Sequence, residues 1–288
     1  MRYVLAISGG VDSVVLLDVM SRTEKDIVVA HFDHGIRQDS AADARFVEAL
    51  AAKYRAQYIG QREELGADAS EEQARERRYA FLNDIAADFG GTVATAHHQD
   101  DIVETVALNL RRGARWRGLA GMSDSRILRP LSSWTKQQVY EYAAKHRLEW
   151  CEDETNSSEK YTRNILRRRI QQQISPEVRS EIYELWRAQR KLRRTLEAEL
   201  KRFDKQILSR YFLIQIEENV ALELLYYYVL RHAGVSLLTA QLERMLVAIK
   251  TGHPGTVWQL GSGAVMKLTA RDVIINEVDY SLDRKSVV

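Results

Sequence analysis

Short runs rich in apolar residues alternate with longer segments of helical periodicity in the first half of the chain. The short runs predict buried strands at residues 3–7, 27–32, 57–59 and 92–96. The longer segments predict helices over residues 13–20, 43–54, 70–89 and 101–110. Strands and helices that alternate at this spacing form right-handed βαβ crossovers, so we predict an α/β fold with a doubly wound, mainly parallel sheet.

The pattern changes after residue 111, where glycine-spaced polar residues replace the regular alternation. We expect three further helices: one over residues 135–146, a basic one that starts near residue 161, and a long one from Pro176 to about residue 209. The long helix has charged residues on its exposed faces, which is typical of a linker between two bodies.

The last part of the chain predicts a small α+β module. Its helices are expected at residues 220–232 and 239–250, and its strands near residues 256–260, 264–269 and 272–278. We therefore predict an α/β domain over residues 1–173, a helical linker over 174–210 and a small α+β domain over 211–288.

Composition places the chain among soluble globular proteins. It has 288 residues, of which 45% are hydrophobic and 28% charged, and no apolar run approaches the roughly 20 residues of a membrane helix. Because the first strand starts at once, we expect a cytoplasmic protein with no leader segment and no membrane partner. Cys151 is the single cysteine, which excludes a disulfide within one chain and a cysteine-based metal cluster.

Charge is distributed unevenly, although the formal net charge is only +2. Between residues 163 and 202 there are twelve Lys or Arg residues against five Asp or Glu residues. Because nucleic-acid affinity depends on local clusters of positive charge, this basic surplus indicates a nucleic-acid partner more strongly than the net charge does.

A glycine turn joins the first predicted strand to the first predicted helix. Its six residues are Ser8, Gly9, Gly10, Val11, Asp12 and Ser13. The glycines let a ligand approach the main chain, the helix directs its first N–H groups into the turn, and the carboxylate could hold Mg²⁺ beside phosphates. The turn lacks the lysine of a Walker A loop and the spacing of a dinucleotide fingerprint. It predicts a phosphate-binding site, although as a bare string it also fits an ordinary strand-to-helix turn.

Two acidic residues three positions apart open the helix after the fourth predicted strand. Asp101 and Glu104 share one helix face and could hold an ammonium group or a metal ion. Helix starts favour acidic residues through the dipole alone, so N-terminal capping explains the pair equally well. His31 and His34 could be metal ligands, but without a convincing third ligand we favour core or solvent-facing histidines.

Arginine clusters occur in two places after the fourth predicted strand. One lies in the glycine-spaced loop that contains Trp116, and the other starts near residue 163. Arginine can pair bidentately with phosphate and tryptophan can stack on an unpaired base, so the combined set favours RNA contact. The residues predicted to contact RNA are Arg111, Arg112, Arg115, Arg117, Arg163, Asn164 and Arg167. Arg75 and Arg78 share a helix face and could form surface ion pairs or contact phosphate; by themselves they favour surface ion pairs.

The motifs in this order resemble one family of enzymes. The glycine turn resembles the loop of the N-type ATP pyrophosphatases, or PP-loop enzymes, which cleave ATP between its α and β phosphates. The whole series, over about residues 4–170, resembles the tRNA(Ile)-lysidine synthetases. Its segments are residues 8–13, 31–37, 73–79, 96–105, 112–122, 129–131, 153–156 and 163–167.

Outside this series the resemblance is weaker. The module after residue 211 resembles the family's first C-terminal domain more loosely, and we expect the larger second C-terminal domain of longer members to be absent. Asp33 stands where the family often has Asn, and Arg115 with Trp116 replaces a small or apolar pair. These departures affect fine substrate contacts rather than the chemistry.

This resemblance implies an adenine nucleotide α-hydrolase-like fold and a ligase that uses ATP and Mg²⁺. The wobble cytidine of tRNA(Ile) with a CAU anticodon would be adenylated at its C2 oxygen, and free L-lysine would then displace AMP. Residues 8–13 would hold the triphosphate, with Asp12 as the Mg²⁺ contact. Asp101 and Glu104 would bind lysine, Arg78 would steady developing charge, and the C-terminal domain would bind tRNA.

Two rival functions are compatible with parts of the sequence. A tRNA thiolase of the same ATPase class generally needs a cysteine pair or an iron–sulfur cluster, and one cysteine cannot form an internal pair. A non-catalytic, nucleotide-responsive RNA-binding protein would explain the basic clusters and the glycine turn, but not the acidic pair. The sequence does not identify the base that deprotonates lysine, and it is compatible with a homodimer without indicating one.

Overall fold

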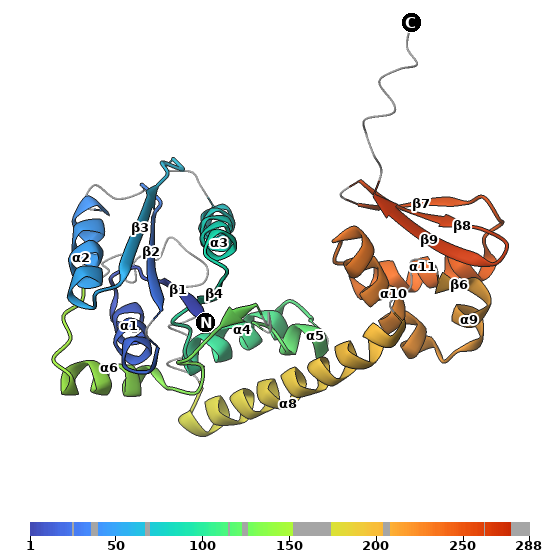
Figure 1. The fold of residues 1–288 in the computed structure, drawn as a ribbon. Coiled ribbons are helices and arrows are strands. Elements are labelled where there is room, and N and C mark those ends of the chain that lie inside the picture. Colours follow the sequence, from blue (N-terminus) through green and yellow to red (C-terminus); the bar gives the residue numbers. More distant parts are fainter. Residues whose placement is uncertain are drawn as a thin grey trace, which may run out of the picture. The chain divides into compact units, whose positions relative to one another are not determined.

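The computed structural model describes most of the chain, and Figure 1 shows it as a ribbon. The described residues are 1–24, 26–35, 40–66, 70–114, 116–122, 126–151, 174–203, 208–261 and 263–277. They form two compact units, residues 1–191 and residues 192–288. The domain boundaries at residues 173 and 210 remain a prediction from the sequence. Four residues predicted to contact RNA lie outside the described part of the chain: Arg115, Arg163, Asn164 and Arg167.

The first unit is built on a five-stranded parallel sheet. Its strands in chain order are β1 (Arg2–Ala6), β2 (Ile27–Asp33), β3 (Gln57–Arg62), β4 (Gly91–Ala94) and β5 (Ile127–Leu128). They lie side by side in the order β3-β2-β1-β4-β5. In the central strand, Val4 pairs with Val28 on one side and with Val93 on the other.

Helices cover both faces of this sheet, and Figure 1 shows α3 on the opposite side from α1 and α2. One face carries α1 (Val11–Thr23), α2 (Ser40–Lys53) and α6 (Lys136–Lys145), which pack on Leu5. The other carries α3 (Glu71–Asp88), which packs on Val4. Successive side chains of a strand point to opposite faces, so β1 serves both apolar clusters. The prediction of a doubly wound α/β fold with a mainly parallel sheet is confirmed.

The strand order reverses between β1 and β4. From β1 the chain continues to β2 and β3 on one side, whereas β4 and β5 lie on the other. In an open parallel sheet, the loops that leave such a pair of strands diverge to opposite faces and leave room for a ligand between them. The glycine turn of residues 8–13 follows β1, and the segment with the acidic pair follows β4.

Asp18 ties α6 to α1. Its carboxylate accepts hydrogen bonds from the Tyr54 and Tyr142 hydroxyls at 2.8 and 2.7 Å, and from Arg22 Nε at 2.7 Å. Burial raises the pKa of Asp18, but the hydrogen bonds from Arg22, Tyr142 and Tyr54 outweigh it, so its pKa is lowered overall. Because Tyr142 belongs to α6, this buried carboxylate holds the helix in place.

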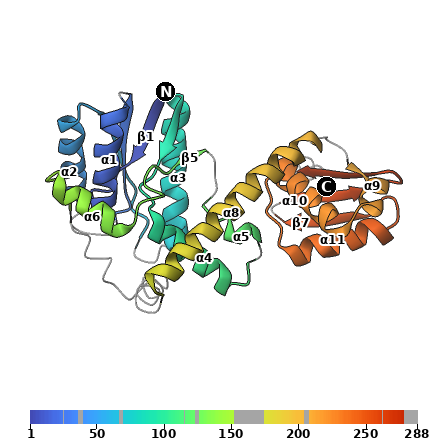
Figure 2. The same cartoon turned by 90° about the horizontal axis from the view of Figure 1, so that it is seen from below.

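The long helix α8 (Pro176–Leu200) packs on α4 (Gln99–Arg111), and Figure 2 shows the two side by side. Trp186 is 2% exposed, lies in an apolar cluster with Ile102 and Val106, and donates from Nε1 to the Gly121 carbonyl at 2.7 Å. The prediction that this helix reaches about residue 209 is wrong. The helix ends at Leu200 and tightens into a 3-10 turn over Lys201–Phe203. Leu208 and Ser209, which the prediction placed in the helix, instead form a strand that pairs with Val273 and Asp272.

The second unit is a small α+β module. Its antiparallel sheet has the order β6-β9-β8-β7, and its helices pack against one face around a shared apolar core. The elements are β6 (Leu208–Ser209), α9 (Arg210–Gln215), α10 (Glu218–Ala233), α11 (Thr239–Thr251), β7 (Val257–Gly261), β8 (Ala264–Leu268) and β9 (Asp272–Glu277). The sequence did not predict β6 and α9, since such short elements leave no periodic pattern. Within the described residues, no helix has the length and apolarity needed to span a bilayer.

We expect Trp186→Phe to lower the free energy of unfolding by about 1–2 kcal/mol, because a buried ring remains while the Gly121 carbonyl loses its donor. Urea unfolding followed by circular dichroism measures the loss. Trp258→Phe is the matched control: this side chain is 36% exposed, and its replacement should change stability by less than about 0.5 kcal/mol. Equal losses in both variants would contradict a specific role for the Trp186 hydrogen bond.

Candidate active site

The turn after β1 is folded around one hydroxyl group. Ser13 Oγ donates to the Gly10 carbonyl at 2.8 Å and accepts from the backbone N–H groups of Ser8 and Gly9 at 3.3 and 3.2 Å. Gly10 is the N-cap of α1 and contributes no side chain there. The first N–H groups of a helix have no intrahelical acceptor, and the helix dipole is positive at this end. The turn therefore offers main-chain donors to an anion.

Gly9 has a backbone conformation that favours glycine, with φ at +95°. A Cβ added there would lie 3.5 Å or more from Val47, Phe46 and Cys151, so the backbone and not the available space requires glycine. The Gly9 carbonyl accepts a hydrogen bond from the Cys151 N–H at 3.0 Å. The turn is thus held by the hydrogen bonds of its own Ser13 and by one from Cys151, which is distant in the sequence.

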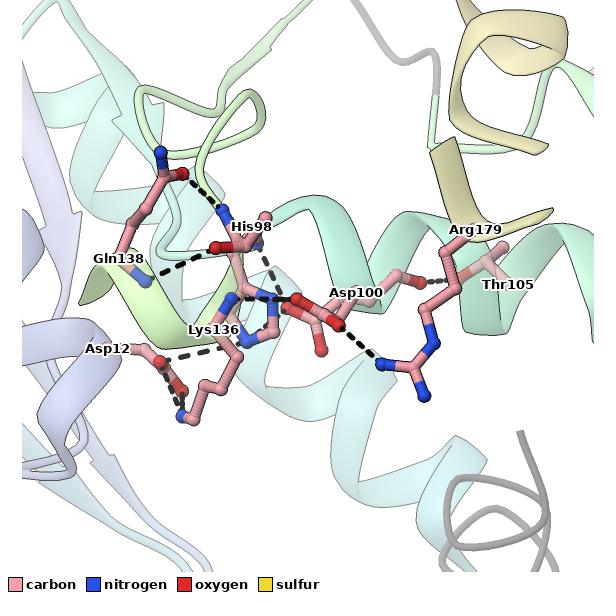
Figure 3. A network of polar contacts seen from close by, with 9 residues as sticks. Asp12, His98, Asp100, Thr105, Lys136, Gln138 and Arg179 are labelled. Atoms are coloured by element: carbon pink, nitrogen blue, oxygen red, sulfur yellow. Dashed lines mark hydrogen bonds and ion pairs between the residues drawn. The ribbon is translucent and has the colours of Figure 1, made fainter. Parts of the chain in front are cut away.

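Lys136 reaches the turn from the first position of α6, as Figure 3 shows. Its Nζ donates to Asp12 Oδ1 at 2.6 Å and to Oδ2 at 2.8 Å. The two side chains are about one third exposed, so the ion pair is accessible from solvent. A cation and a carboxylate beside the N–H groups at a helix start suit the binding of a metal-bound phosphate group.

His98 lies between the turn and α4. Its side chain is buried, and Nε2 is 3.7 Å from Asp12 Oδ1 and 3.4 Å from Asp101 Oδ2. Its Nδ1 is 3.7 Å from Asp100 Oδ2. The imidazole is thus surrounded by three carboxylates from two helices (Figure 3), and it joins the glycine turn and the acidic pair into one polar cluster.

Asp101 and Glu104 are both buried, at 9% and 2% exposure. Asp101 Oδ2 accepts a hydrogen bond from the His98 N–H at 3.0 Å, which caps α4. The helix consequently begins at Gln99, two residues before the predicted start. Capping is therefore one role of Asp101, whereas Glu104 lies one turn further along. Both carboxylates face the same side of α4, so capping and the binding of a cation do not exclude each other.

His97 is held in its neutral form. Desolvation lowers the pKa of His97 to about 3, Asp101 opposes this shift, and the positive charges of Arg129, Arg75 and Arg78 add to it. Its Nδ1 lies 2.7 Å from Thr95 Oγ1. The imidazole therefore adds no positive charge to the surroundings of the acidic pair at neutral pH.

Arg78 acts at the same edge of the sheet. Burial lowers the pKa of His34, and the charge of Arg78 lowers it further, as it does for His97. The arginine is thus close to both histidines, which its spacing on α3 alone did not indicate. His31 is buried and donates from Nδ1 to the Ile7 carbonyl at 2.9 Å. Among the described residues, no three His, Cys, Asp or Glu side chains form a group that could hold a metal ion.

Among the described residues, three of the arginines predicted to contact RNA are found at the C-terminal end of α4 and just beyond it. Arg111 and Arg112 are exposed there. Arg117 belongs to the short helix α5 (Trp116–Leu119), and its guanidinium lies 4.6 Å from the centre of the Trp116 ring. These three arginines therefore occupy one segment that follows directly from the helix with the acidic pair.

Neither Lys136 nor Asp100 was predicted from the sequence. The Thr135–Gln138 capping pattern marks the start of a helix but does not indicate where its first side chain points. Lys136 contacts Asp12 from 124 residues away and Asp100 from 36 residues away. Only the packing of α6 on α1 and α4 brings these charges together, so no local signal could have identified them.

The sequence model of the PP-loop domain family matches residues 1–174. A tRNA(Ile)-lysidine synthase from Exiguobacterium sibiricum is 37% identical over 174 residues, which are 58% of this chain and 42% of the relative. A protein with the same name from Thermotoga maritima is 34% identical over 215 residues, 69% of this chain and 52% of the relative. The chain thus spans about half or less of the length of these relatives. The family resemblance drawn from the motifs is confirmed.

A solved structure shows the same fold. The U34-tRNA thiolase from Methanococcus maripaludis matches 67% of this chain and 71% of its own, with a TM-score of 0.54 and 17% sequence identity. At this identity the likeness concerns the fold alone, in agreement with the parallel sheet described above.

The low pKa of His97 makes stability depend on pH. Below about pH 6.5 the unfolded chain binds a proton at this residue, whereas the folded chain does so only near pH 3, so stability falls as pH falls through this window. Between about pH 7.5 and about pH 5, urea unfolding should show a loss about 2 kcal/mol larger for the wild type than for His97→Gln. Equal losses would contradict the suppressed protonation of His97.

Proposed function

Because this chain belongs to the PP-loop domain family, we propose that it is a tRNA(Ile)-lysidine synthetase. The C2 oxygen of the wobble cytidine in tRNA(Ile) with a CAU anticodon attacks the α phosphate of ATP, and pyrophosphate leaves. The ε-amine of free L-lysine then attacks C2, the bond between C2 and the adenylate oxygen breaks, and AMP leaves. The product is lysidine. The names of the curated relatives support the choice of tRNA(Ile) and lysine.

The observation that carries this proposal is the single histidine between the two motif groups. His98 Nε2 lies within 3.7 Å of Asp12 in the glycine turn and of Asp101 in the acidic pair. In the proposed reaction the α phosphate of ATP and the amine of lysine both react at C2 of the same cytidine, the phosphate with its oxygen and the amine with its carbon. The ATP site and the lysine site must therefore adjoin. A protein that only bound nucleotide and RNA would have no use for this proximity.

The glycine turn would hold the triphosphate of ATP. Lys136 would exchange its ion pair with Asp12 for a phosphate oxygen, which would release the Asp12 carboxylate for Mg²⁺. Magnesium in nucleotide sites is commonly held by one or two carboxylates together with phosphate oxygens, so a single aspartate fits this ion. When bound, it would neutralise charge on the departing pyrophosphate.

The acidic pair would bind an ammonium group of lysine. Asp101 and Glu104 are buried, and a buried carboxylate favours an opposite charge strongly because little water screens the interaction. His97 stays neutral beside them and so does not compete with the substrate as a cation. Arg78 carries positive charge at the same edge and would steady the negative charge of the adenylate.

The arginine segment would contact the tRNA. Arg111, Arg112 and Arg117 offer guanidinium groups for phosphates, and Trp116 offers a ring for stacking. We include Arg115, Arg163, Asn164 and Arg167 in the same role, together with the small domain predicted over residues 211–288. Affinity for tRNA should fall as salt rises, since each phosphate contact releases counterions.

The test of this function is the incorporation of radiolabelled lysine into tRNA transcripts in the presence of ATP and Mg²⁺. We expect label in the transcript with a CAU anticodon and none in one with a GAU anticodon. The label should survive mild alkaline treatment, because lysidine contains a C–N bond and not an ester. Formation of AMP and pyrophosphate without labelled tRNA would reject lysine as the nucleophile and favour a sulfur or ammonia donor.

Glu104→Gln should raise the KM for lysine about 10–100-fold, because a charged hydrogen bond of this kind is worth about 1.5–3 kcal/mol. Formation of adenylated tRNA without lysine should continue at nearly the wild-type rate. Steady-state kinetics at varied lysine concentration and a single-turnover assay without lysine separate the two effects. Glu141→Gln, on the exposed face of α6, is the control. A variant with slower adenylation and an unchanged KM for lysine would contradict the role of Glu104.

A further inference from the structure

We propose that Asp100 is a positioning residue for Lys136, and that its contact with Arg179 makes the long helix α8 part of the ATP side of the site. The proposal rests on the proposed function only in so far as Lys136 and Asp12 meet the phosphates of ATP. Asp100 belongs neither to the glycine turn nor to the acidic pair. It lies in the first turn of α4, where it contacts Lys136 and Arg179 (Figure 3).

Asp100 supplies an acceptor that α6 itself lacks. Lys136 is the first residue of α6, so its N–H has no partner within the helix. The capping box uses other donors: the Gln138 N–H bonds Thr135 Oγ1 at 3.2 Å, and the Thr135 N–H bonds Gln138 Oε1 at 2.8 Å. Asp100 Oδ2 accepts the remaining Lys136 N–H at 2.7 Å. An anion at this end of a helix is also favoured by the dipole.

The same residue therefore has its backbone held by Asp100 and its side chain held by Asp12. Lys136 Nζ reaches both oxygens of Asp12 at 2.6 and 2.8 Å, and it must reach a phosphate from the same backbone position. A displacement of about 1 Å at a positioning group can reduce the rate on the order of 100-fold. The hydrogen bond that the Lys136 N–H donates to Asp100 thus fixes the backbone position from which the lysine side chain extends.

Arg179 connects this arrangement to α8. Its Nη1 lies 3.8 Å from Asp100 Oδ1, the oxygen that does not accept from Lys136, and its Nε donates to the Ile174 carbonyl at 3.1 Å. Two turns further along, Trp186 fastens the same helix to Gly121. Figure 3 shows the resulting series of contacts from Arg179 through Asp100 and Lys136 to Asp12. The four residues come from α8, α4, α6 and α1.

A purely structural role for Asp100 makes a different prediction from a positioning role. If Asp100 only capped α6, its loss would lower stability and weaken nucleotide binding by a factor that does not depend on Lys136. If it acts through Lys136, its loss should have no further effect once the lysine side chain is gone. A double-mutant cycle distinguishes these cases.

The experiment measures the binding of α,β-methylene-ATP with Mg²⁺ by isothermal titration calorimetry, without tRNA or lysine. This analogue cannot be cleaved between the α and β phosphates, so binding is observed without reaction. We expect Lys136→Met to weaken binding about 10–100-fold and Asp100→Ala to weaken it about tenfold. Asp100→Ala in the Lys136→Met background should cause less than a twofold further change.

Arg179→Gln tests the connection to α8, and Arg187→Gln is its matched control. Both substitutions remove one arginine from the same helix, but Arg187 is 59% exposed and pairs with Glu184 at 2.9 Å. We expect Arg179→Gln to weaken binding of the analogue about threefold, and only when Lys136 is present. Arg187→Gln should leave it unchanged.

Thermal unfolding checks that each variant is folded, and Asp100→Leu, which also lacks an acceptor for the Lys136 N–H, replaces Asp100→Ala if the latter is not. Equal factors for the Asp100 substitution in both backgrounds, or equal effects of the two arginine substitutions, would overturn the proposal. A wild-type protein that does not bind the analogue would overturn the ATP site and this inference with it. If the double-mutant cycle gives the expected result but no lysine is incorporated into tRNA, only the proposed substrate is rejected.

Discussion

The parallel pairing of β1 with β4, at the point where the strand order reverses, is the constraint on which the site depends. Both strands end at the same edge, so the glycine turn and the acidic pair leave the sheet as neighbours although about 90 residues separate them. The pairing is held by residues buried on both faces, such as Val4 and Leu5. A change in the register between β1 and β4 would move the glycine turn away from the acidic pair, because each loop moves with the strand that it follows.

Buried polar contacts then decide where individual side chains lie. Burying a charge is unfavourable unless partners compensate it, so Asp18, Asp101 and His98 are each found beside groups that can donate or accept protons or carry opposite charge. These contacts also join helices: Asp18 joins α1 to α6, and Trp186 joins α8 to α4. The polar cluster at the sheet edge therefore rests on helices that are themselves fastened by polar contacts.

The residues proposed to take part in the chemistry all belong to one of the two units. Every residue that we place at the ATP and lysine sites lies within residues 1–191, and the family match covers residues 1–174. Helix α8 starts in the first unit, packed on the helix with the acidic pair, and continues into the second. The helix that the sequence predicts as a linker is thus, over its first four turns, packed on α4 as part of the first unit.

The sequence by itself determined the fold class, the glycine turn and the acidic pair. Each of these depends on residues close together in the chain: apolar runs make strands, two glycines between a strand and a helix make an anion-binding turn, and a spacing of three puts two acids on one helix face. Only the tertiary structure decided that Lys136 meets Asp12, that Asp100 holds Lys136, and that Arg78 acts on His97. Those contacts join elements that are distant along the chain, and the packing of helices on the sheet creates them. No pattern of neighbouring residues in the sequence indicates such packing.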